Sequence, residues 1–382
     1  MQTKLINFVQ EIYQTKEFIP LHAPSFPGNE KLYLSNTIDS TFVSSVGKYV
    51  DQFELQIENY TSSIKATAVV NGTAALHAAL YMAGVVADDL VITQALTFVA
   101  TCNALYHMGA SPVFVDVSKT SLGLCPKSLE SYLLENAFID DDGVSLHKVT
   151  KQVFRAVVPM HTFGHPAELD ELLIVCKKWN IVLIEDAAES LGSFYKGKHT
   201  GIFGEYGAIS FNGNKIITTG GGGVVLCQSQ AQGLRTKHLT TTAKVPHAFE
   251  FIHDEAGFNY RMPNLNAALG CAQMEGLPKK AQQKRELAQL YKELFKTSEY
   301  QFFTEPDYAQ SNYWLNTIIC PDIGSRNQFL EDTNSHLVMT RPVWQLMHKL
   351  PMYCNNFRAE LTNSEWLADR IVNIPSSAPN WN

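Results

Sequence analysis

The sequence predicts an α/β fold in which a mostly parallel, seven-stranded sheet lies between helices and a smaller α+β domain follows at the C-terminus. The first observation is the regular alternation of short β-branched runs and helical patterns between residues 66 and 226. The second is that these runs are almost continuously apolar, as parallel strands buried on both faces of a sheet are. The third is the length of 382 residues, which exceeds what one hydrophobic core usually serves.

The elements of the large domain can be followed in chain order. A short N-terminal helix is followed by loop signals (Pro20, Pro24, Pro27 and Gly28) and by a helical pattern over residues 30–41. Strands are expected at residues 66–70, 90–93, 113–117, 155–160, 181–185, 208–211 and 223–226. Between several of them the spacing predicts helices at residues 73–83, 98–108, 126–135 and 168–179.

The C-terminal part begins with a long helical region. A helix is expected over residues 264–277, and Pro278 then opens a second helix over residues 279–295. Strand candidates follow at residues 313–320 and 337–339, and residues 136–150 have the composition of a surface excursion. We therefore expect residues 1–277 to form an N-terminal segment and the large domain, and residues 278–382 a linking helix and the small domain.

Composition and charge argue against several classes of protein. A net charge of −7 and a pI near 5.9 give no support for a nucleic-acid partner. Seven scattered cysteines without a CxxC pair predict reduced thiols in a cytoplasmic protein and no zinc site. The acidic run 140–142 is expected to be a solvated loop tip, because it lacks the spacing of a calcium loop. No signal peptide, membrane anchor or other metal site is expected.

Four segments at the carboxyl ends of expected strands point to one ligand site. In the first, VNGTAAL at residues 70–76, a strand passes into a helix. The free N–H groups of a helix N-terminus bind phosphate, and Gly72 lets the backbone approach closely. An ordinary capped helix with Thr73 as its N-cap explains this segment equally well.

The second segment places Asp186 directly after the apolar run 181–184. A carboxylate at that position can keep a pyridinium nitrogen protonated, which makes an aromatic cofactor an electron sink. A magnesium ligand of an ATPase and a helix-capping aspartate are equally consistent with this segment alone.

The third segment contains Lys215, which lies in a mostly uncharged stretch between a strand and the glycine run 220–223. Poor hydration should lower the pKa of such a lysine and favour the neutral amine that forms an imine. Ser210 lies within reach of a phosphate, and the order GxxxxGK[ST] of a P-loop is absent. In the fourth segment Phe98 follows a strand and is placed to stack on a planar cofactor, although a core phenylalanine opening a helix is the commoner explanation.

These motifs occur in an order that resembles a known family. Along the chain come NGTAAL, TFVA, a V-x-V-D strand ending at Asp116, HTFGHP, EDAAESLG, SFNGNK, a glycine-rich turn and GFNYRMPNLNAALG. Nearly the whole chain thus resembles the fold-type I pyridoxal-5′-phosphate enzymes, and more closely the DegT/StrS nucleotide-sugar aminotransferases. The resemblance implies that the large domain binds pyridoxal 5′-phosphate.

Site roles follow from this resemblance by position. Lys215 would form the Schiff base with the cofactor and carry the proton, and Asp186 would pair with the pyridine nitrogen. Glu189 stands where the family usually has a polar residue, often glutamine, near the ring hydroxyl. Phosphate contacts would come from Thr73, Ala74 and Ser210, and Phe98 would stack on the ring. Asn259 matches an asparagine that reaches the phosphate of the neighbouring subunit, which implies a homodimer with shared active sites.

The resemblance also indicates a reaction and a substrate. Related dehydratases have histidine at the position of Lys215, so the lysine favours transamination, with L-glutamate as amino donor. Residues 18–47 resemble the subgroup that aminates C4 of a UDP-linked 2-acetamido-4-keto-6-deoxyhexose for bacterial surface glycans, as in bacillosamine- and legionaminic-acid-type pathways. Expected sugar-nucleotide contacts are Ser45 (with Ser44 and Gly47), His161, Arg261, Arg341 and His348, and an exposed histidine unrelated to substrate explains His348 equally well.

Other functions are compatible with parts of this pattern. An aminotransferase acting on a 3-keto sugar, or on a dTDP- or GDP-linked one, would share most of the motifs. A non-catalytic regulatory protein that binds the cofactor is disfavoured by the joint presence of Lys215, Asp186 and Ser210. A dinucleotide-dependent oxidoreductase is disfavoured because no GxGxxG follows the first strand.

Overall fold

The large domain is built on the expected seven-stranded sheet. A computed structural model describes residues 1–379, and all seven expected strands pair in one sheet in the order β1-β11-β10-β7-β6-β2-β3. Five neighbouring strands are parallel, and β11 runs antiparallel to both β1 and β10. The bounds are β1 Lys65–Val69, β2 Leu90–Gln94, β3 Ser111–Val115, β6 Phe154–Val158, β7 Val182–Asp186, β10 Tyr206–Ser210 and β11 Gly223–Cys227.

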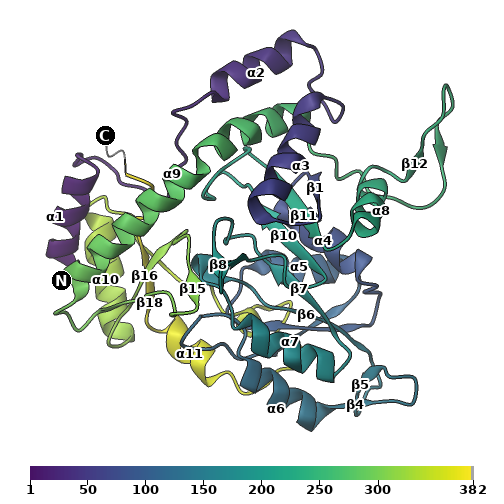
Figure 1. Cartoon of the computed structure of the whole chain (residues 1–382). Helices are drawn as coiled ribbons and strands as arrows, with labels where there is room; N and C mark the ends of the chain where they lie inside the picture. Colours follow the sequence, from purple (N-terminus) through teal and green to yellow (C-terminus); the bar gives the residue numbers. More distant parts are fainter. Residues whose placement is uncertain (380–382) are drawn as a thin grey trace.

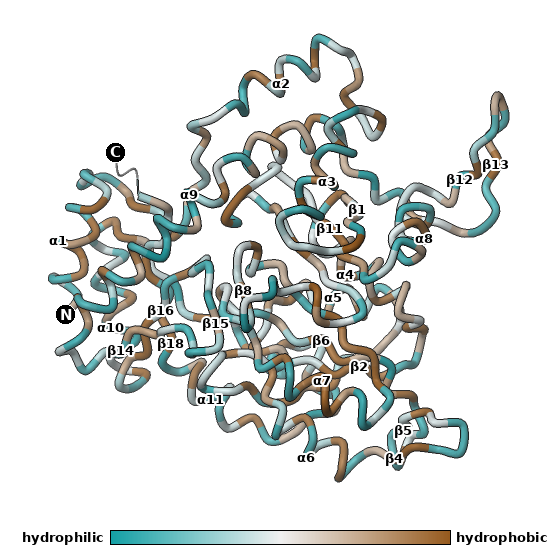
Figure 2. The backbone as a smooth tube through the Cα atoms, viewed as in Figure 1, coloured by the Kyte–Doolittle hydropathy of each residue, from teal (hydrophilic) through white to brown (hydrophobic). Residues whose placement is uncertain are grey.

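Helices cover both faces of this sheet, which confirms the α/β prediction (Figure 1). Side chains alternate between the faces, so that Val225 of β11 joins one apolar cluster while Val224 and Leu226 join another. One face packs against α4 (Gly72–Met82) and α5 (Val99–His107). The other face packs against α3 (Lys48–Thr61), α6 (Pro126–Asn136), α7 (Leu169–Lys178) and the first half of α9 (Asn264–Phe295). Figure 2 shows the hydrophobic residues along the inner strand β2.

A single helix, α9, replaces the two helices expected on either side of Pro278. It continues through the proline for 32 residues, so the prediction of a new helix start at this residue is wrong. Proline removes one hydrogen bond from a helix interior. Here both halves of α9 are held by packing, the first against α3 and the sheet and the second against the C-terminal domain, which offsets that loss.

The small C-terminal domain contains an antiparallel four-stranded sheet in the order β14-β16-β18-β17. Its strand candidate at 313–320 is confirmed as β16. The candidate at 337–339 is wrong: Val338 makes only an isolated bridge to Ile19, and β17 begins at Arg341. The elements are β14 Gln301–Phe302, β16 Asn316–Ile319, β17 Arg341–Pro342, β18 Ile371–Ile374, α10 Ile323–Ser335 and α11 Thr362–Ala368.

The first helix, α1 (Gln2–Ile12), packs against this C-terminal domain. Leu5, Ile6 and Val9 join the apolar cluster of Tyr291 and Val372. We propose the domain division near residue 277 as the sequence suggests it, with α1 counted as part of the C-terminal domain.

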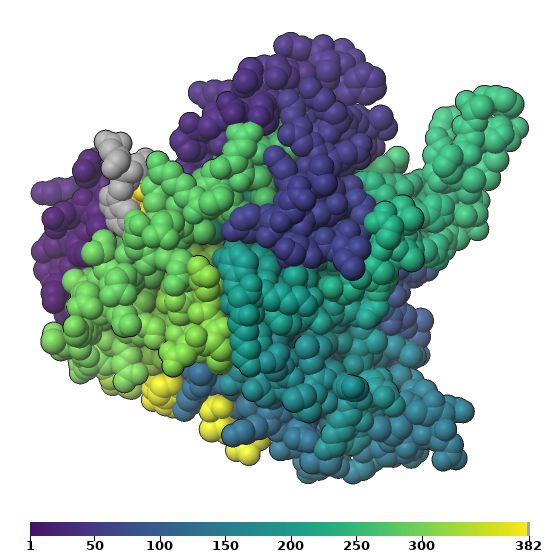
Figure 3. All heavy atoms as spheres, in the orientation of Figure 1, coloured from purple at the N-terminus to yellow at the C-terminus, as the bar shows by residue number. Residues whose placement is uncertain are grey.

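The remaining elements lie around the sheet. The expected surface excursion is the hairpin of β4 (Ala137–Ile139) and β5 (Ser145–His147), and its tip at Asp140 is closed by a hydrogen bond from Val144 N. A second hairpin, β12 (Lys244–Val245) with β13 (Ile252–His253), projects from the body after α8 (Gln230–Thr240) (Figure 3). Other elements are α2 Glu30–Asp39, β8 Phe194–Tyr195, β9 Lys198–His199, β15 Ala309–Gln310, and the short helices Thr162–Gly164 and Met347–Lys349. Within residues 1–379 no helix has both the length and the apolar composition needed to cross a membrane.

Candidate active site

A cavity of about 340 Å³ lies at the carboxyl ends of the parallel strands. The ends of β7 and β10 and the N-terminus of α4 form its floor, and two tryptophans from the C-terminal part of the chain form its wall. This is the position in which ligands bind in open α/β sheets. Its lining includes Asn71, Gly72, Thr73, Leu76, Phe98, Ala100, Met160, Asp186, Ala188, Glu189, Ser210, Asn212, Asn214, Lys215, Trp314 and Trp344.

Lys215 lies in this cavity, in a tight loop that follows β10. Its side chain is only 13% exposed, and its Nζ lies 3.2 Å from Oε1 of Glu189 and 4.0 Å from the ring centre of Trp314. The loop is held by Trp314, whose indole N–H donates to the carbonyl oxygen of Asn214 at 2.7 Å. The lysine amine is therefore fixed in a mostly apolar pocket beside one carboxylate.

Asp186 ends strand β7 and lies on the cavity floor. Thr101 Oγ1 donates to its Oδ2 at 2.7 Å, and the N–H of Ala188 donates to its Oδ1 at 3.1 Å. Burial raises the pKa of Asp186 above its usual value, while these two hydrogen bonds and the charge of Lys215 act in the opposite direction. The sheet, by placing this carboxylate at the strand mouth, brings it into the same cavity as the lysine.

Glu189 is a second carboxylate in the cavity, three residues after Asp186. Its side chain is 1% exposed, its Oε2 accepts from the N–H of Phe163 at 2.9 Å, and its Oε1 faces Lys215. Burial raises the pKa of Glu189 to about 7, even though the Lys215 ammonium lowers it. Burial thus makes the protonated form of Glu189 easier to reach than that of an exposed glutamate.

The N-terminus of α4 and Ser210 form a cradle for an anion. A Cβ atom added to Gly72 would lie 2.7 Å from Cβ of Ser210, so only glycine lets the two segments approach this closely. A Cβ at Gly223 would similarly lie 2.4 Å from the carbonyl oxygen of Asn71. Among residues 1–379 no acceptor faces the N–H groups of Gly72 and Thr73, which leaves them available to a phosphate.

The cap of α4 is Asn71 and not Thr73, which was the cap in the alternative interpretation of this segment as an ordinary capped helix. The side chain of Asn71 accepts from the N–H of Ala74 at 2.8 Å, so this N–H is already satisfied within the chain. Ala74 lies beside the cavity but is not part of its lining. Thr73 does line it, and its hydroxyl is free to bind a ligand.

Aromatic side chains close the cavity from above. Phe98, which precedes α5, is 45% exposed and lies edge-on to Trp344, with ring centres 5.9 Å apart. Trp314 and Trp344 come from the C-terminal part of the chain, more than 90 residues after Lys215. A planar aromatic ligand on the cavity floor would therefore meet apolar ring surfaces.

These groups fit pyridoxal 5′-phosphate, the cofactor that the sequence predicts. The cradle beside Gly72, which a Cβ would fill, offers free N–H groups and two hydroxyls for the phosphate. Asp186 is a fixed carboxylate suited to a pyridinium nitrogen, and Lys215 supplies an amine in the same cavity. The cavity therefore contains a phosphate cradle, an acid partner for the ring nitrogen and a lysine amine for covalent attachment.

His161, expected to contact the sugar, is a structural histidine, so this expectation is wrong. Its side chain is 0% exposed, its Nε2 lies 3.0 Å from Oε2 of Glu185, and its Nδ1 accepts from the N–H of Ala167 at 3.1 Å. Both ring nitrogens are thus used inside the protein. The Nδ1 contact places the ring proton on Nε2, which donates it to Glu185.

The other expected sugar contacts also lie outside the cavity lining of this single chain. Ser45 is half-buried in a loop that is tied to the start of α9, where the N–H of Asn264 donates to the carbonyl oxygen of Ser44. Arg341 is exposed on β17. His348 is largely buried, and its Nε2 lies 3.5 Å from Glu365 Oε1.

Asn259 and Arg261 form a pair on the segment that runs along β1. The Arg261 Nε donates to Oδ1 of Asn259 at 2.9 Å, and Arg261 bridges Val69 of β1. Asn259 is exposed and does not line the cavity of its own chain. A contact of Asn259 with the phosphate of a neighbouring subunit remains a prediction.

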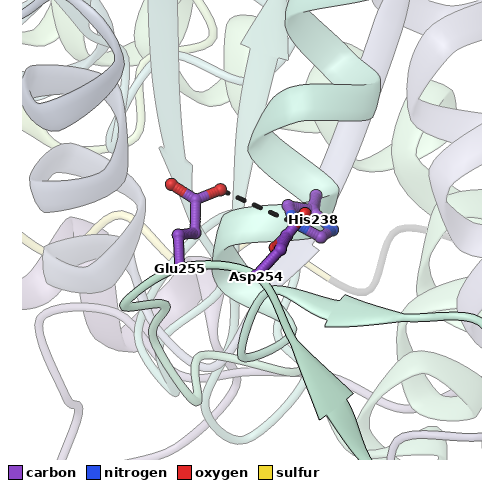
Figure 4. Close-up of side chains that lie close together, drawn as sticks. All are labelled: His238, Asp254 and Glu255. Atoms are coloured by element: carbon purple, nitrogen blue, oxygen red, sulfur yellow. Dashed lines mark hydrogen bonds and ion pairs between the residues drawn. The ribbon is translucent and has the colours of Figure 1, made fainter.

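A cluster of ionisable groups outside the cavity holds the projecting hairpin (Figure 4). His238 of α8 lies 2.7 Å from Oδ1 of Asp254 and 3.5 Å from Oε1 of Glu255. The three groups are close enough to share a cation, but both oxygens of Glu255 also accept from the guanidinium of Arg235. Ion pairs with α8 therefore anchor the base of this hairpin.

Sequence reasoning missed the two tryptophans of the cavity. Trp344 lies inside the stretch 340–348, in which only Arg341 and His348 were expected to bind. A signal was present, since aromatic residues line cofactor pockets more often than isolated charges do. Trp314 carried no comparable signal, because its partner Asn214 is 100 residues away in the chain and Lys215 is next to Asn214.

Comparisons with known proteins agree with this geometry. Residues 26–379 match the DegT/DnrJ/EryC1/StrS aminotransferase family. The chain is 34% identical to a GDP-perosamine synthase of Escherichia coli O157:H7, over 94% of this chain and 93% of that protein. It is 35% identical to EpsN of Bacillus subtilis strain 168, described as a putative pyridoxal phosphate-dependent aminotransferase, over 88% and 84% of the two chains. The solved structure of PseC, a Helicobacter pylori aminotransferase, has the same fold, with a TM-score of 0.85 at 22% identity over 96% and 95% of the chains.

Proposed function

This chain belongs to the DegT/DnrJ/EryC1/StrS aminotransferase family, and on that basis we propose both the amino donor and the sugar acceptor of its reaction. Enzymes of this family are pyridoxal-5′-phosphate-dependent sugar aminotransferases, and so is this chain. We propose that it transfers the amino group of L-glutamate to the C4 keto group of a UDP-linked 2-acetamido-2,6-dideoxy-4-ketohexose, for the synthesis of a bacterial surface glycan. The observation that carries the proposal is the cavity that joins Lys215, Asp186 and the cradle at Gly72.

Each residue has a defined task in this proposal. Bound pyridoxal phosphate supplies an aromatic ring that accepts the electrons of the breaking C–H bond. Asp186 holds a proton at the ring nitrogen, while Gly72 N–H, Thr73 and Ser210 hold the phosphate. Lys215 attaches the cofactor covalently and, once its amine is released, moves a proton to and from the substrate carbon. Phe98 covers the ring.

The role of Lys215 can be tested by substitution. Lys215→Ala should abolish both the violet absorbance of the covalently bound cofactor and amino transfer, because no other lysine lines the cavity within residues 1–379. Lys196→Ala, at an exposed lysine paired with Asp170, is the matched control and should retain both. A Lys215→Ala protein that kept absorbance and turnover would refute the assignment.

The identity of the sugar ketone can be tested with a panel of candidate substrates. The purified enzyme should be offered L-glutamate with a panel of UDP-, GDP- and dTDP-linked 4-keto and 3-keto sugars, and the amino sugar identified by NMR. We expect the UDP-linked 2-acetamido-4-keto-6-deoxy sugar to have the highest kcat/KM. A preference for a 3-keto sugar would refute C4 chemistry.

A GDP-linked 4-keto-6-deoxyhexose is the second candidate substrate. It is favoured by the identity of 34% over 94% of the chain to a protein described as GDP-perosamine synthase. The same panel separates the two candidates, because they differ in the nucleotide and in the 2-acetamido group. Higher kcat/KM with the GDP-linked sugar would replace the UDP assignment and leave the aminotransferase mechanism intact.

We also propose that the enzyme is a homodimer in the cytoplasm. Large apolar side chains are exposed along and after α2 and on the projecting hairpin, including Leu32, Ile38, Phe42, Phe249 and Phe251. Several large apolar side chains exposed on projecting segments are typical of surfaces that another chain covers. The seven cysteines are all free, which supports a reducing compartment.

A further inference from the structure

The cavity contains more carboxylates than one lysine can neutralise. Lys215 is the only cation in its lining within the described residues, and it faces the carboxylates of Asp186 and Glu189. The remaining contacts of Glu189 are uncharged: the N–H of Phe163 at its Oε2, and the amide of Asn312 at its backbone carbonyl. When the lysine amine loses its charge, no other side chain that lines the cofactor-free cavity can balance the two carboxylates.

We propose that Glu189 is the proton acceptor of Lys215, taking a proton at Oε1 when the lysine amine becomes neutral to attach the cofactor. The reason for the proton transfer, attachment of the cofactor, rests on the proposed function. The geometry that supports the transfer does not. In the step, an N–H bond of the ammonium breaks and an O–H bond of the carboxyl group forms, so that both charges disappear together. The 3.2 Å separation of the two atoms permits direct transfer without another reactant.

The environments of the two carboxylates decide which of them accepts the proton. Both oxygens of Asp186 accept a hydrogen bond, one from the Thr101 hydroxyl and one from the Ala188 N–H. Glu189 has one such bond, from Phe163, and its other oxygen depends on Lys215. Hydrogen bonds stabilise the ionised form, so Asp186 keeps its charge and Glu189 gives it up first.

Burial favours transfer of the proton from Lys215 to Glu189 once the neutral amine is needed. A buried ion pair is stabilised only by its mutual attraction and loses the hydration of both charges. The neutral amine is the nucleophile that forms the bond to the cofactor aldehyde. A pKa near 7 for Glu189 agrees with a carboxyl group that takes up and releases a proton at neutral pH.

A glutamine at this position would make the same polar contact but could not accept a proton. The proposal therefore separates Glu189 from a residue that merely orients the lysine. It is a positioning and proton-holding role at Oε1, additional to the roles of Lys215 and Asp186.

Infrared difference spectra of cofactor-free variants test directly whether Glu189 holds a proton when residue 215 carries no charge. At about pH 8, Lys215→Met should show the carbonyl band of one buried protonated carboxyl group, because the cation is gone. Lys215→Arg should lack this band, because arginine keeps its charge. The double variant Lys215→Met/Glu189→Gln should lose the band. Its persistence in the double variant, or its absence in Lys215→Met, would overturn the proposal.

The cofactor provides a second measurement. Addition of pyridoxal phosphate to the wild-type protein should produce the acid band in step with the absorbance of the attached cofactor, and Glu189→Gln should give that absorbance without the band. Glu54→Gln, which alters a buried glutamate paired with Lys237 outside the cavity, should behave like the wild type. Violet absorbance without the acid band in the wild type overturns the inference and leaves the proposed function standing. Absence of the absorbance refutes the proposed function, while the Lys215→Met and Lys215→Arg spectra still decide the role of Glu189.

Discussion

At the scale of single residues, the charge of Asp186 depends on a neighbour that touches no ligand. Thr101 is 1% exposed and lies on α5, and its hydroxyl donates to Asp186 at 2.7 Å. A buried carboxylate would otherwise favour its protonated form, which cannot keep a proton on a ring nitrogen. Thr101 therefore belongs to the functional site although it lies outside the cavity lining.

Thr101→Val should lower kcat/KM with little change in folding. A hydrogen bond to a charged group is worth roughly 1.5–3 kcal/mol, so a loss of about tenfold to a hundredfold is expected. The limb of the pH–rate profile that reports Asp186 should move to higher pH, since the hydroxyl that lowers its pKa is removed. Thr97→Val is the control, because Thr97 contacts Thr101 and Met160 but not Asp186. Equal effects of the two substitutions would contradict this role.

Glu189 should make stability depend on pH. Burial raises its pKa to about 7, so the folded state binds a proton more tightly than the unfolded chain. This contribution is fully present below the unfolded pKa near 4.5 and is lost as pH rises through about 7. Relative to the wild type, cofactor-free Glu189→Gln should therefore gain stability between about pH 5 and pH 8, by at most about 3 kcal/mol. Urea unfolding across this pH range measures the free energy of unfolding of both proteins. A difference between them that does not change with pH would contradict the raised pKa of Glu189.

The role of a single residue could be predicted where its neighbours in the sequence indicate it, and not where it depends on contacts with distant parts of the chain. Asp186 and Ser210 end strands and Lys215 follows one, so their position in the chain indicated one edge of the sheet, and the structure brings them together. His161 was misassigned because a buried histidine paired with Glu185 and a ligand histidine look alike in sequence. Trp314 depends on a contact across 100 residues, which no local pattern reports.

At the scale of elements, the junction of β1 and α4 sets the phosphate cradle. Gly72→Ala should weaken cofactor binding by about tenfold or more, because its Cβ would lie 2.7 Å from Ser210 and force the two segments apart. Gly276→Ala, in the middle of α9 with no neighbour closer than 4.0 Å, is the control and should leave affinity unchanged. A cofactor titration followed by absorbance compares the two, and unchanged affinity in Gly72→Ala would remove the cradle from the proposed site.

Elements were predictable where packing and pattern agree. The seven strands of the large sheet are mostly apolar and buried, and all were found from the sequence. In the small domain, β14 and β17 have two residues each, too few to show any periodicity. Helix α9 continues through Pro278 because tertiary packing outweighs a local signal that usually ends a helix.

At the scale of the whole molecule, the proposed dimer would share its active sites. Lys215→Ala and Asn259→Ala should each be inactive alone, since one removes the amine and the other the phosphate contact offered to the partner. Mixed and allowed to exchange subunits, they should recover about a quarter of wild-type activity, because half of the dimers are mixed and each has one intact site. Light scattering should report dimers throughout. No recovery in mixed dimers would place Asn259 outside the partner's site.

The packing of α1 has a consequence for the order in which the chain can mature on the ribosome. Helix α1 buries Leu5, Ile6 and Val9 against residues more than 300 positions later in the chain, such as Ile318 and Val372. It must therefore wait, with its apolar face uncovered, for nearly the whole chain to be translated. Trp314 and Trp344, which close the cavity, also arrive late. We therefore expect cofactor capture to come late in biogenesis, and a nascent chain stalled before residue 314 to expose both an unpaired amphipathic helix and an unshielded Lys215.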